Sequence, residues 1–339
     1  MAIDRRTGLG IMGRCACVAV AAMAGWPIVA APLTVAWGTS NWEQDWVGAT
    51  TESSKGFKVP DAAVESDTAV INQGCTVVVD SAVSVAVGDL LLANTDSGQP
   101  ESRLNIDPGG RLTADGAVTI SASADAGTLN IRGGALVTRH PVAVNKGGAL
   151  NLSKGSFTND AAGPRIVLQD TDGAGGAVNI SGGTFTARGA DPTDFLEVNA
   201  DEINLSGGIV DMRGGQVLAA DTTTISVIGG DADITMDRLN LNDPERAATL
   251  RFVFDESGVA AIKSNAFIHL GSATIEVDGS GYTGGPAVFD LLTTPHLASG
   301  ARKVEITGLG KEGVGYRFTQ SIDTHVVQIQ VLKPAEPGG

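Results

Sequence analysis

The sequence Val178-Asn179-Ile180-Ser181-Gly182-Gly183-Thr184-Phe185-Thr186 is one copy of a unit that recurs along the chain. The other copies begin at Leu104, Leu129, Leu150 and Ile203, and a more divergent copy begins at Ile225. From the first copy onward, the starts lie 25, 21, 28, 25 and 22 residues apart. A repeat of roughly 20–50 residues is typical of a solenoid, in which each turn contributes a few short strands. The sequence therefore predicts a stack of similar turns.

Each unit opens with an apolar-Asn-apolar triplet, which is followed by a Gly-Gly pair or its equivalent. Side chains alternate along a strand, so the two apolar residues face one side and the Asn faces the other. The glycines supply the φ > 0 conformations of a corner, where a Cβ would cost roughly 1–2 kcal/mol. A second set of apolar side chains follows each corner: Leu112, Leu136, Phe157, Phe185 and Val210. We therefore predict an all-β fold, a right-handed parallel β-helix with N- and C-terminal caps, whose handedness follows the general rule for strand crossovers.

The triplets place one asparagine at the same position of each turn: Asn105, Asn130, Asn151, Asn179 and Asn204. Stacked turns would align these side chains into a ladder of amide hydrogen bonds. The alternative is that they face water as ordinary polar strand positions. In both cases we interpret them as structural rather than catalytic residues, because an amide bonded above and below has little capacity left for a ligand.

Composition and charge restrict the possible partners. The chain has 339 residues, of which 45 are Gly, 4% are aromatic and 18% are charged, a profile that favours turns and narrow strands. The formal net charge is −15, so the field around the molecule repels nucleic acid and anionic lipid. We expect no nucleic-acid partner. The acidic residues are scattered, which is typical of a solvated surface.

Residues 1–36 have the features of an export signal. Three arginines form a basic start, and Cys15 to Ala24 is a run of apolar and small residues that is too short for a convincing membrane span. Cleavage is expected after Ala31 or Ala36. We therefore predict an extracellular or cell-surface protein whose mature chain has no membrane span.

The mature chain divides into four segments. Three tryptophans, Trp37, Trp42 and Trp46, follow the signal directly. The first turn of a solenoid exposes apolar groups and unpaired backbone, so we interpret the tryptophans as part of a cap; a carbohydrate-stacking platform is the alternative. The predicted segments are an N-terminal cap at 37–75, β-helix repeats at 76–246, terminal turns with a C-terminal β cap at 247–332, and a disordered tail at 333–339.

Three features together resemble exported bacterial β-helix proteins of the autotransporter-passenger and PEP-CTERM type. They are the Trp37–Trp46 segment before a Val-rich strand, the Leu-Asn-Ile-x-Gly-Gly units, and the ending formed by Ile275–Thr283 and Phe289–Leu292. The resemblance implies a right-handed parallel β-helix, secreted or at the cell surface, of a type that usually has no demonstrated catalysis. Residues 333–339 depart from those families, because they supply neither a sorting signal nor an outer-membrane barrel. A fragment of a larger passenger is therefore one further interpretation.

Two groups of carboxylates are candidates for chemistry. Parallel β-helices also carry polysaccharide lyases and glycosidases, in which carboxylates bind Ca²⁺ or act as acid and base, and Arg or Lys polarises a uronate. The candidates in this chain are Asp170 and Asp172 beside Arg165, and Asp231, Asp233 and Asp237 beside Arg238. Alternating Asp residues share a face of a strand, so the spacing permits a cation site, although Asp-x-Asp next to Gly is more often a solvated turn.

The preferred prediction from sequence is a non-enzymatic, secreted or cell-surface protein with a structural or adhesive role. It has no cofactor, and its partner is an extracellular polysaccharide or a cell-surface component. The alternative is a carbohydrate-active enzyme on the same scaffold, with Ca²⁺ as a possible cofactor. The low aromatic content of the repeats favours the first prediction.

Overall fold

The regular secondary structure in the described part of the chain is entirely β. A computed structural model describes residues 33–36, 39–41, 69–72, 76–80, 84–93, 101–121, 126–160, 166–167, 175–188, 195–198, 201–219, 223–242 and 248–332. Within these ranges every regular element is a β-strand. None of these residues forms a helix with the length and apolar character that crossing a bilayer requires.

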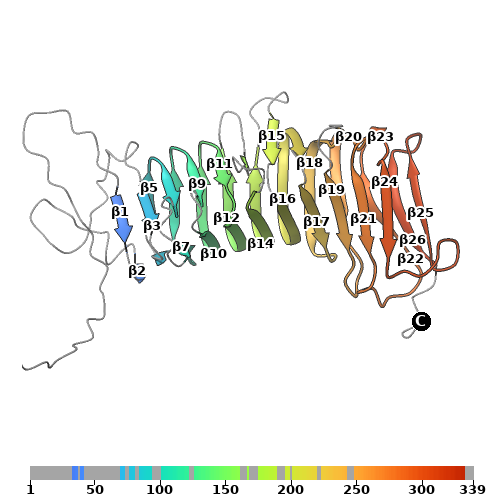
Figure 1. The fold of residues 1–339 in the computed structure, drawn as a ribbon, viewed down its shortest axis with the longest axis horizontal. Helices are drawn as coiled ribbons and strands as arrows, with labels where there is room; N and C mark the ends of the chain where they lie inside the picture. The colour runs from blue at the N-terminus through green and yellow to red at the C-terminus, as the bar shows by residue number, and fades with distance from the viewer. Residues whose placement is uncertain are drawn as a thin grey trace, which may run out of the picture.

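Strands of successive turns stack in parallel into an elongated solenoid, from β1 at one end to β25 and β26 at the other (Figure 1). Each turn contributes to three faces. We call the first the Asn face, because it carries the predicted asparagines. Its strands are β2 (Thr39–Asn41), β4 (Thr76–Val79), β7 (Ser102–Ile106), the first parts of β10 (Gly127–Thr138), β12 (Gly148–Asn159), β14 (Ala177–Ala187) and β16 (Glu202–Ala219), then β17 (Thr224–Ile228), β19 (Thr249–Val253), β21 (Thr274–Asp278) and β24 (Lys303–Thr307).

The second face, which we call the Phe face, follows the glycine corner. Its strands are β5 (Ser84–Val87), β8 (Arg111–Ala114), the second parts of β10, β12 and β14, the middle of β16, then β18 (Ala232–Asn240), β20 (Ile262–His269) and β22 (Ala287–Thr293). The third, the closing face, returns the chain to the next turn. It comprises β1 (Leu33–Ala36), β3 (Ala69–Asn72), β6 (Leu90–Leu92), β9 (Val118–Ile120), β11 (Val142–Val144), β13 (Ile166–Val167), β15 (Phe195–Val198), the ends of β16, β18 and β20, and β23 (Leu297–Ser299).

The all-β, parallel solenoid that the sequence predicts is confirmed. Among the described residues between positions 76 and 246, the Asn face carries seven strands, one from each of about seven turns. Parallel stacking then continues through β19, β21 and β24, where the Asn-Gly-Gly motif has been lost. It continues because inward apolar residues persist: Leu250, Phe252, Ile275 and Val277 are all buried.

The core runs along the axis of the solenoid. The residues expected to point inward after each corner are at most 2% exposed: Leu112, Leu136, Phe157, Phe185 and Val210. Phe157 and Phe185 are register partners on neighbouring turns, and their rings stack with centroids 4.8 Å apart and planes 10° apart. These inward residues form a column along the core, which joins adjacent turns by both burial and ring stacking.

The corner between the Asn and Phe faces depends on glycine for two reasons. Gly155, Gly183 and Gly208 have φ values of 83°, 76° and 81°, which residues with a Cβ rarely adopt. The turns also approach closely, because a Cβ on Gly183 would lie 2.6 Å from the carbonyl oxygen of Gly155, and one on Gly208 would lie 2.6 Å from that of Gly183. Glycine at this position thus permits both the bend and the stacking of successive bends.

At the N-terminal end, the stack starts inside the segment predicted as an export signal. β1 pairs in parallel with β3, so cleavage after Ala31 would keep this strand, whereas cleavage after Ala36 would remove it. Trp37, Trp42 and Trp46 lie outside the described residues, as does the tail at 333–339. The predicted cap at 37–75 includes β2 and β3, which stack in parallel on later strands.

At the C-terminal end, the strand direction changes. β25 (Tyr316–Ser321) and β26 (Val326–Val331) form an antiparallel sheet with β22. Phe254, Tyr282 and Phe289 meet edge to face beside it, with ring centroids between 5.0 and 5.9 Å apart. This antiparallel sheet occupies the place of the C-terminal β cap that the sequence predicts.

Candidate functional site

The asparagines of the Asn face bond to one another in a ladder. Each side-chain amide donates from Nδ2 to Oδ1 of the asparagine one turn earlier: Asn130 to Asn105 at 2.8 Å, Asn151 to Asn130 at 2.9 Å, Asn179 to Asn151 at 2.8 Å, and Asn204 to Asn179 at 2.9 Å. The sequence allowed either a ladder of amide hydrogen bonds or ordinary polar positions facing water, and the ladder is confirmed. The interior amides use a donor and an acceptor on their neighbours, so their role is to hold turns in register.

The predicted carboxylate candidates do not form one site. Asp170, Asp172 and Arg165 lie outside the described residues, so a calcium site at that loop stays a prediction. Asp231 and Asp233 are exposed on the Phe face, and Asp233 accepts from Lys263 Nζ at 2.8 Å. Within the described ranges, no three His, Cys, Asp or Glu side chains lie close enough together to hold a metal ion.

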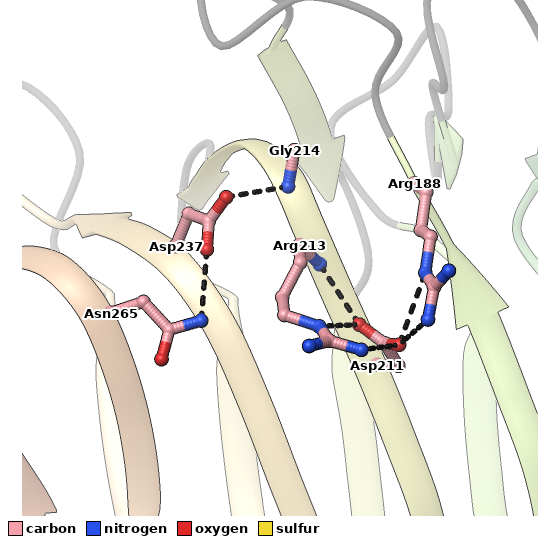
Figure 2. A network of polar contacts seen from close by, with 6 residues as sticks. All are labelled: Arg188, Asp211, Arg213, Gly214, Asp237 and Asn265. Atoms are coloured by element: carbon pink, nitrogen blue, oxygen red, sulfur yellow. Dashed lines mark hydrogen bonds and ion pairs between the residues drawn. The ribbon is translucent and has the colours of Figure 1, made fainter.

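Asp237 belongs to a different environment, the corner between the Phe and closing faces. β16 bends there at Gly214, which has a φ of 88°, and the register between β16 and β18 shifts between Met212 and Gln216. A bulge of this kind removes a strand partner from the backbone. The N–H of Gly214 instead donates to Asp237 Oδ2 at 2.7 Å, and Asn265 Nδ2 donates to Asp237 Oδ1 at 3.0 Å (Figure 2).

Beside this bend, two arginines from successive turns share one carboxylate. Asp211 lies between them (Figure 2), and its side chain is only 9% exposed. Arg213 donates from Nε to Oδ1 at 2.8 Å and from Nη2 to Oδ2 at 2.7 Å. Arg188 donates to Oδ2 from Nε at 3.1 Å and also from Nη2. These bonds, those from Arg213 above all, hold the pKa of Asp211 well below its ordinary value, against the opposing effect of burial.

The paired arginines interrupt an alternation of charge along this corner. Each corner residue comes directly after the paired part of a Phe-face strand. The register between neighbouring strands therefore gives the order of the corner residues along the axis. In that order they are Asp115, Arg139, Asp160, Arg188, Arg213, Asp237 and Asn265. Arg139 pairs with Asp115 at 2.8 Å, as expected for neighbouring opposite charges. Two like charges are adjacent only at Arg188 and Arg213, and Asp211 supplies the charge that separates them.

Two adjoining hollows follow the corner, and we call them together the corner groove. The first, of about 320 Å³, is lined by Arg188, Arg213, Gly214 and Asp237. The second, of about 230 Å³, is lined by Gly215, Asp237, Arg238, Asn265 and Ala266. Three arginines stand against two aspartates in and beneath this groove, which leaves one excess positive charge on a chain whose formal net charge is −15.

Arg238, one of the residues singled out from sequence, lies in the second hollow. Its guanidinium carbon is 5.8 Å from the ring centroid of Phe267, its register partner on the next turn. A guanidinium over an aromatic face is held by cation–π attraction. The structure therefore separates Arg238 from Asp231 and Asp233, with which the sequence grouped it, and places it with Asp237.

The groove is better suited to binding than to acid–base chemistry. A general acid needs a pKa near the working pH, whereas that of Asp211 is lowered and its oxygens are occupied by arginines. Asp237 likewise accepts two hydrogen bonds from its own chain. What the surface offers to a ligand is exposed guanidinium, since the Arg188 and Arg213 side chains are 56% and 47% exposed.

Sequence reasoning missed Arg188, Asp211, Arg213 and Asn265. One signal was present, because Arg188, Arg213 and Arg238 lie 25 residues apart, close to the repeat period. That spacing alone would have placed the three arginines in one column. Met212 instead pairs with Met236, 24 residues further along the chain, so the column continues with Asp237, and the bulge that follows puts Arg238 opposite Gln216.

No protein-family model, curated protein or solved structure matches the chain. The resemblance to autotransporter passengers and PEP-CTERM proteins therefore stays a prediction from motifs.

Proposed function

We propose that the protein is an exported, non-enzymatic rod with a structural or adhesive role outside the cell or at its surface. The observation that supports this most directly is that polar side chains on the outside of the solenoid bond from turn to turn. The asparagine ladder does so over five turns. Arg132 and Asp107 on neighbouring turns do so as well, at 2.8 Å and 3.0 Å.

The energies of these contacts fit a structural role. An exposed ion pair contributes about 0–1 kcal/mol and an amide hydrogen bond about 1 kcal/mol. Each is small, but in a repeat protein the stability is approximately a sum over turns and their interfaces. Repetition therefore yields a long, stiff object in which polar side chains of neighbouring turns hold each other. The export part of the proposal rests on the basic and apolar start of the sequence.

The corner groove is the observation that keeps a carbohydrate-active enzyme as the second candidate. It combines arginines with the carboxylate of Asp237 on the outer surface of a β-solenoid. An enzyme of this kind would need Asp237 to exchange its bonds to Gly214 and Asn265 for bonds to a substrate. We favour the rod because those bonds belong to the bend itself.

A degradation screen separates the two candidates. The purified chain would be incubated with acidic and neutral polysaccharides, with and without Ca²⁺, and the release of reducing ends and unsaturated products would be measured. We expect no cleavage of any substrate. Cleavage that disappears on Asp237→Asn or Asp233→Asn substitution would replace the rod by the enzyme.

The location needs its own measurement. Antibodies against the purified chain would be used on cell fractions and culture medium of the source organism. We expect the protein in the medium or on the surface, at a mass reduced by removal of the export signal. A full-length chain confined to the cell interior would overturn this part of the proposal.

A further inference from the structure

We propose that the corner groove binds acidic polysaccharide, and that Arg188 and Arg213 are its carboxylate-binding residues. The inference rests on the proposed adhesive function and names the class of ligand that the rod would adhere to. Four properties of the groove carry it: the donors that the two arginines do not direct at Asp211, their fixed positions, the length of the groove and the mixture of charges along it.

The two guanidiniums retain donors for a second carboxylate. A guanidinium has five N–H donors in a planar fork. Arg188 and Arg213 each direct Nε and Nη2 at Asp211, so within the described structure their Nη1 groups carry no hydrogen bond to protein. Both side chains are about half exposed. A ligand carboxylate can therefore bond to the outer side of either fork, the geometry that makes arginine–carboxylate pairs specific.

Asp211 holds the arginines in place before any ligand arrives. Its carboxylate is nearly buried and anchors the Nε and Nη2 positions of both side chains. An arginine that is already ordered loses less conformational entropy on binding than a free one. Because the single negative charge of Asp211 pairs with two arginines, one excess positive charge remains on their solvent-exposed side.

The groove runs along the solenoid axis and so fits a linear ligand. Its residues come from successive turns, from Arg188 after β14, through Arg213 on β16 and Asp237 on β18, to Asn265 on β20. Three intervals between turns correspond to roughly 14 Å at the spacing of hydrogen-bonded strands. The two hollows share Asp237, which makes them parts of one path.

The charges along this path favour a carbohydrate over a denser polyanion. A net charge of −15 repels a nucleic acid over long range, whereas widely spaced carboxylates meet less repulsion. Sugar hydroxyls can donate to the carboxylate of Asp237 and accept from the amide of Asn265, so a chain that carries both carboxylates and hydroxyls matches the lining. A polymer that carries only carboxylates leaves Asp237 facing like charge.

The test is a binding titration of the full chain with polygalacturonate and alginate, with dextran as the neutral polymer and poly-glutamate as the carboxylate polymer without sugars. We expect binding to both uronate polymers, weaker binding to poly-glutamate and none to dextran. Arg188→Gln and Arg213→Gln should each weaken uronate binding about tenfold, the effect of losing one charged hydrogen-bonded contact. Arg→Lys at either position should fall between the wild type and the Gln variant, because the charge stays and the fork is lost.

Arg132→Gln is the matched control, since Arg132 is an arginine of similar exposure that pairs with Asp107 away from the groove. It should leave uronate binding unchanged. Circular dichroism of each variant verifies that the solenoid is intact. Equal weakening by Arg132→Gln, or uronate binding that survives both groove substitutions, would refute the assignment.

Asp211→Asn distinguishes a binding site from a structural ion pair. An amide in place of the carboxylate accepts through one oxygen only and presents its NH₂ group to guanidinium donors, so both arginines lose their fixed positions, and uronate binding should become weaker by several-fold in folded protein. Unchanged affinity would overturn the role of the arginine pair. Absence of uronate binding would refute the inference and leave the rod standing, whereas uronate cleavage would refute the rod; the two failures are therefore distinct.

Discussion

Gly183→Ala tests the physical basis of the repeat, because the corner demands glycine for two separable reasons. The backbone of Gly183 has a φ of 76°, and a Cβ there would lie 2.6 Å from the carbonyl oxygen of Gly155 on the preceding turn. The first property costs a residue with a Cβ about 1–2 kcal/mol. The second requires the turns to move apart, since ordinary contact begins at 3.4 Å and the shortfall is therefore 0.8 Å.

The cost of that movement can be bounded from the contacts beside it. Asn179 donates to Asn151 at 2.8 Å on the same pair of turns, and the Phe157 and Phe185 rings stack at 4.8 Å. Overpacking of this kind costs about 1–3 kcal/mol in well-packed structures. The sum predicts a loss of about 2–5 kcal/mol for Gly183→Ala.

Two other glycines allow the cost of the positive φ and the cost of the close approach to be measured separately. Gly313 has a φ of 78° with no atom within 4 Å of its Cβ position, so Gly313→Ala should lose only the dihedral part, about 1–2 kcal/mol. Gly285 has no neighbour within 4 Å and no positive φ, so Gly285→Ala should be neutral or gain about 0.4–1 kcal/mol from reduced freedom of the unfolded chain. Urea denaturation followed by far-UV circular dichroism would rank the three variants. If Gly183→Ala cost no more than Gly313→Ala, the close approach of the turns would not be what selects glycine at this corner.

Three further predictions concern the ladder, the core column and the buried carboxylate. Asn151 makes two ladder bonds and Asn204 makes one, so Asn151→Ala should cost about 2 kcal/mol and Asn204→Ala about 1 kcal/mol in urea denaturation, and equal costs would argue against the ladder as a source of stability. Phe185→Ala should cost about 3–5 kcal/mol, whereas Thr186→Ala, which faces outward beside it, should stay within about 1 kcal/mol in the same assay. Asp211 has a lower pKa folded than unfolded, so its stabilisation is complete above the ordinary carboxyl range and is lost as the pH falls through and below it. Thermal midpoints measured against pH should fall less steeply on acidification in Asp211→Asn than in the wild type, and parallel curves would contradict the assignment.

The sequence predicts the Asn and Phe faces because their signals are local and periodic. Each triplet places its apolar residues inward and its asparagine outward, as Leu129, Ile131 and Asn130 show in one turn. The corner glycines follow each triplet within a few residues. The closing face has no comparable motif. Its strands β6, β9 and β11 are only three residues long, too short for an alternating pattern to stand out from its surroundings.

The corner groove was beyond sequence reasoning for a geometric reason. Which residues meet at a corner depends on the register between turns, and one shifted residue exchanges neighbours. Met212 pairs with Met236, 24 residues further along the chain rather than 25, and this register puts Asp237, rather than Arg238, next to Arg213. Asp211 was also inconspicuous, since it occupies an outward strand position where its register partners are Thr186 and Thr235.

The same geometry gives the arginine pair its significance. A corner in which Asp115, Arg139, Asp160 and Arg188 alternate in sign needs no further charge to stack, because each residue has an opposite neighbour one turn away. Continuing the alternation would place an acidic residue at 213. Arginine there creates a repulsion with Arg188, and Asp211, whose carboxylate is nearly buried beneath both side chains, is the residue that bonds to both of them. Stacking alone would be served more simply by an acidic residue, since buried charge is costly unless it is fully paired. We therefore interpret the departure from alternation as the mark of a ligand, and the response of uronate binding to Asp211→Asn as its most direct test.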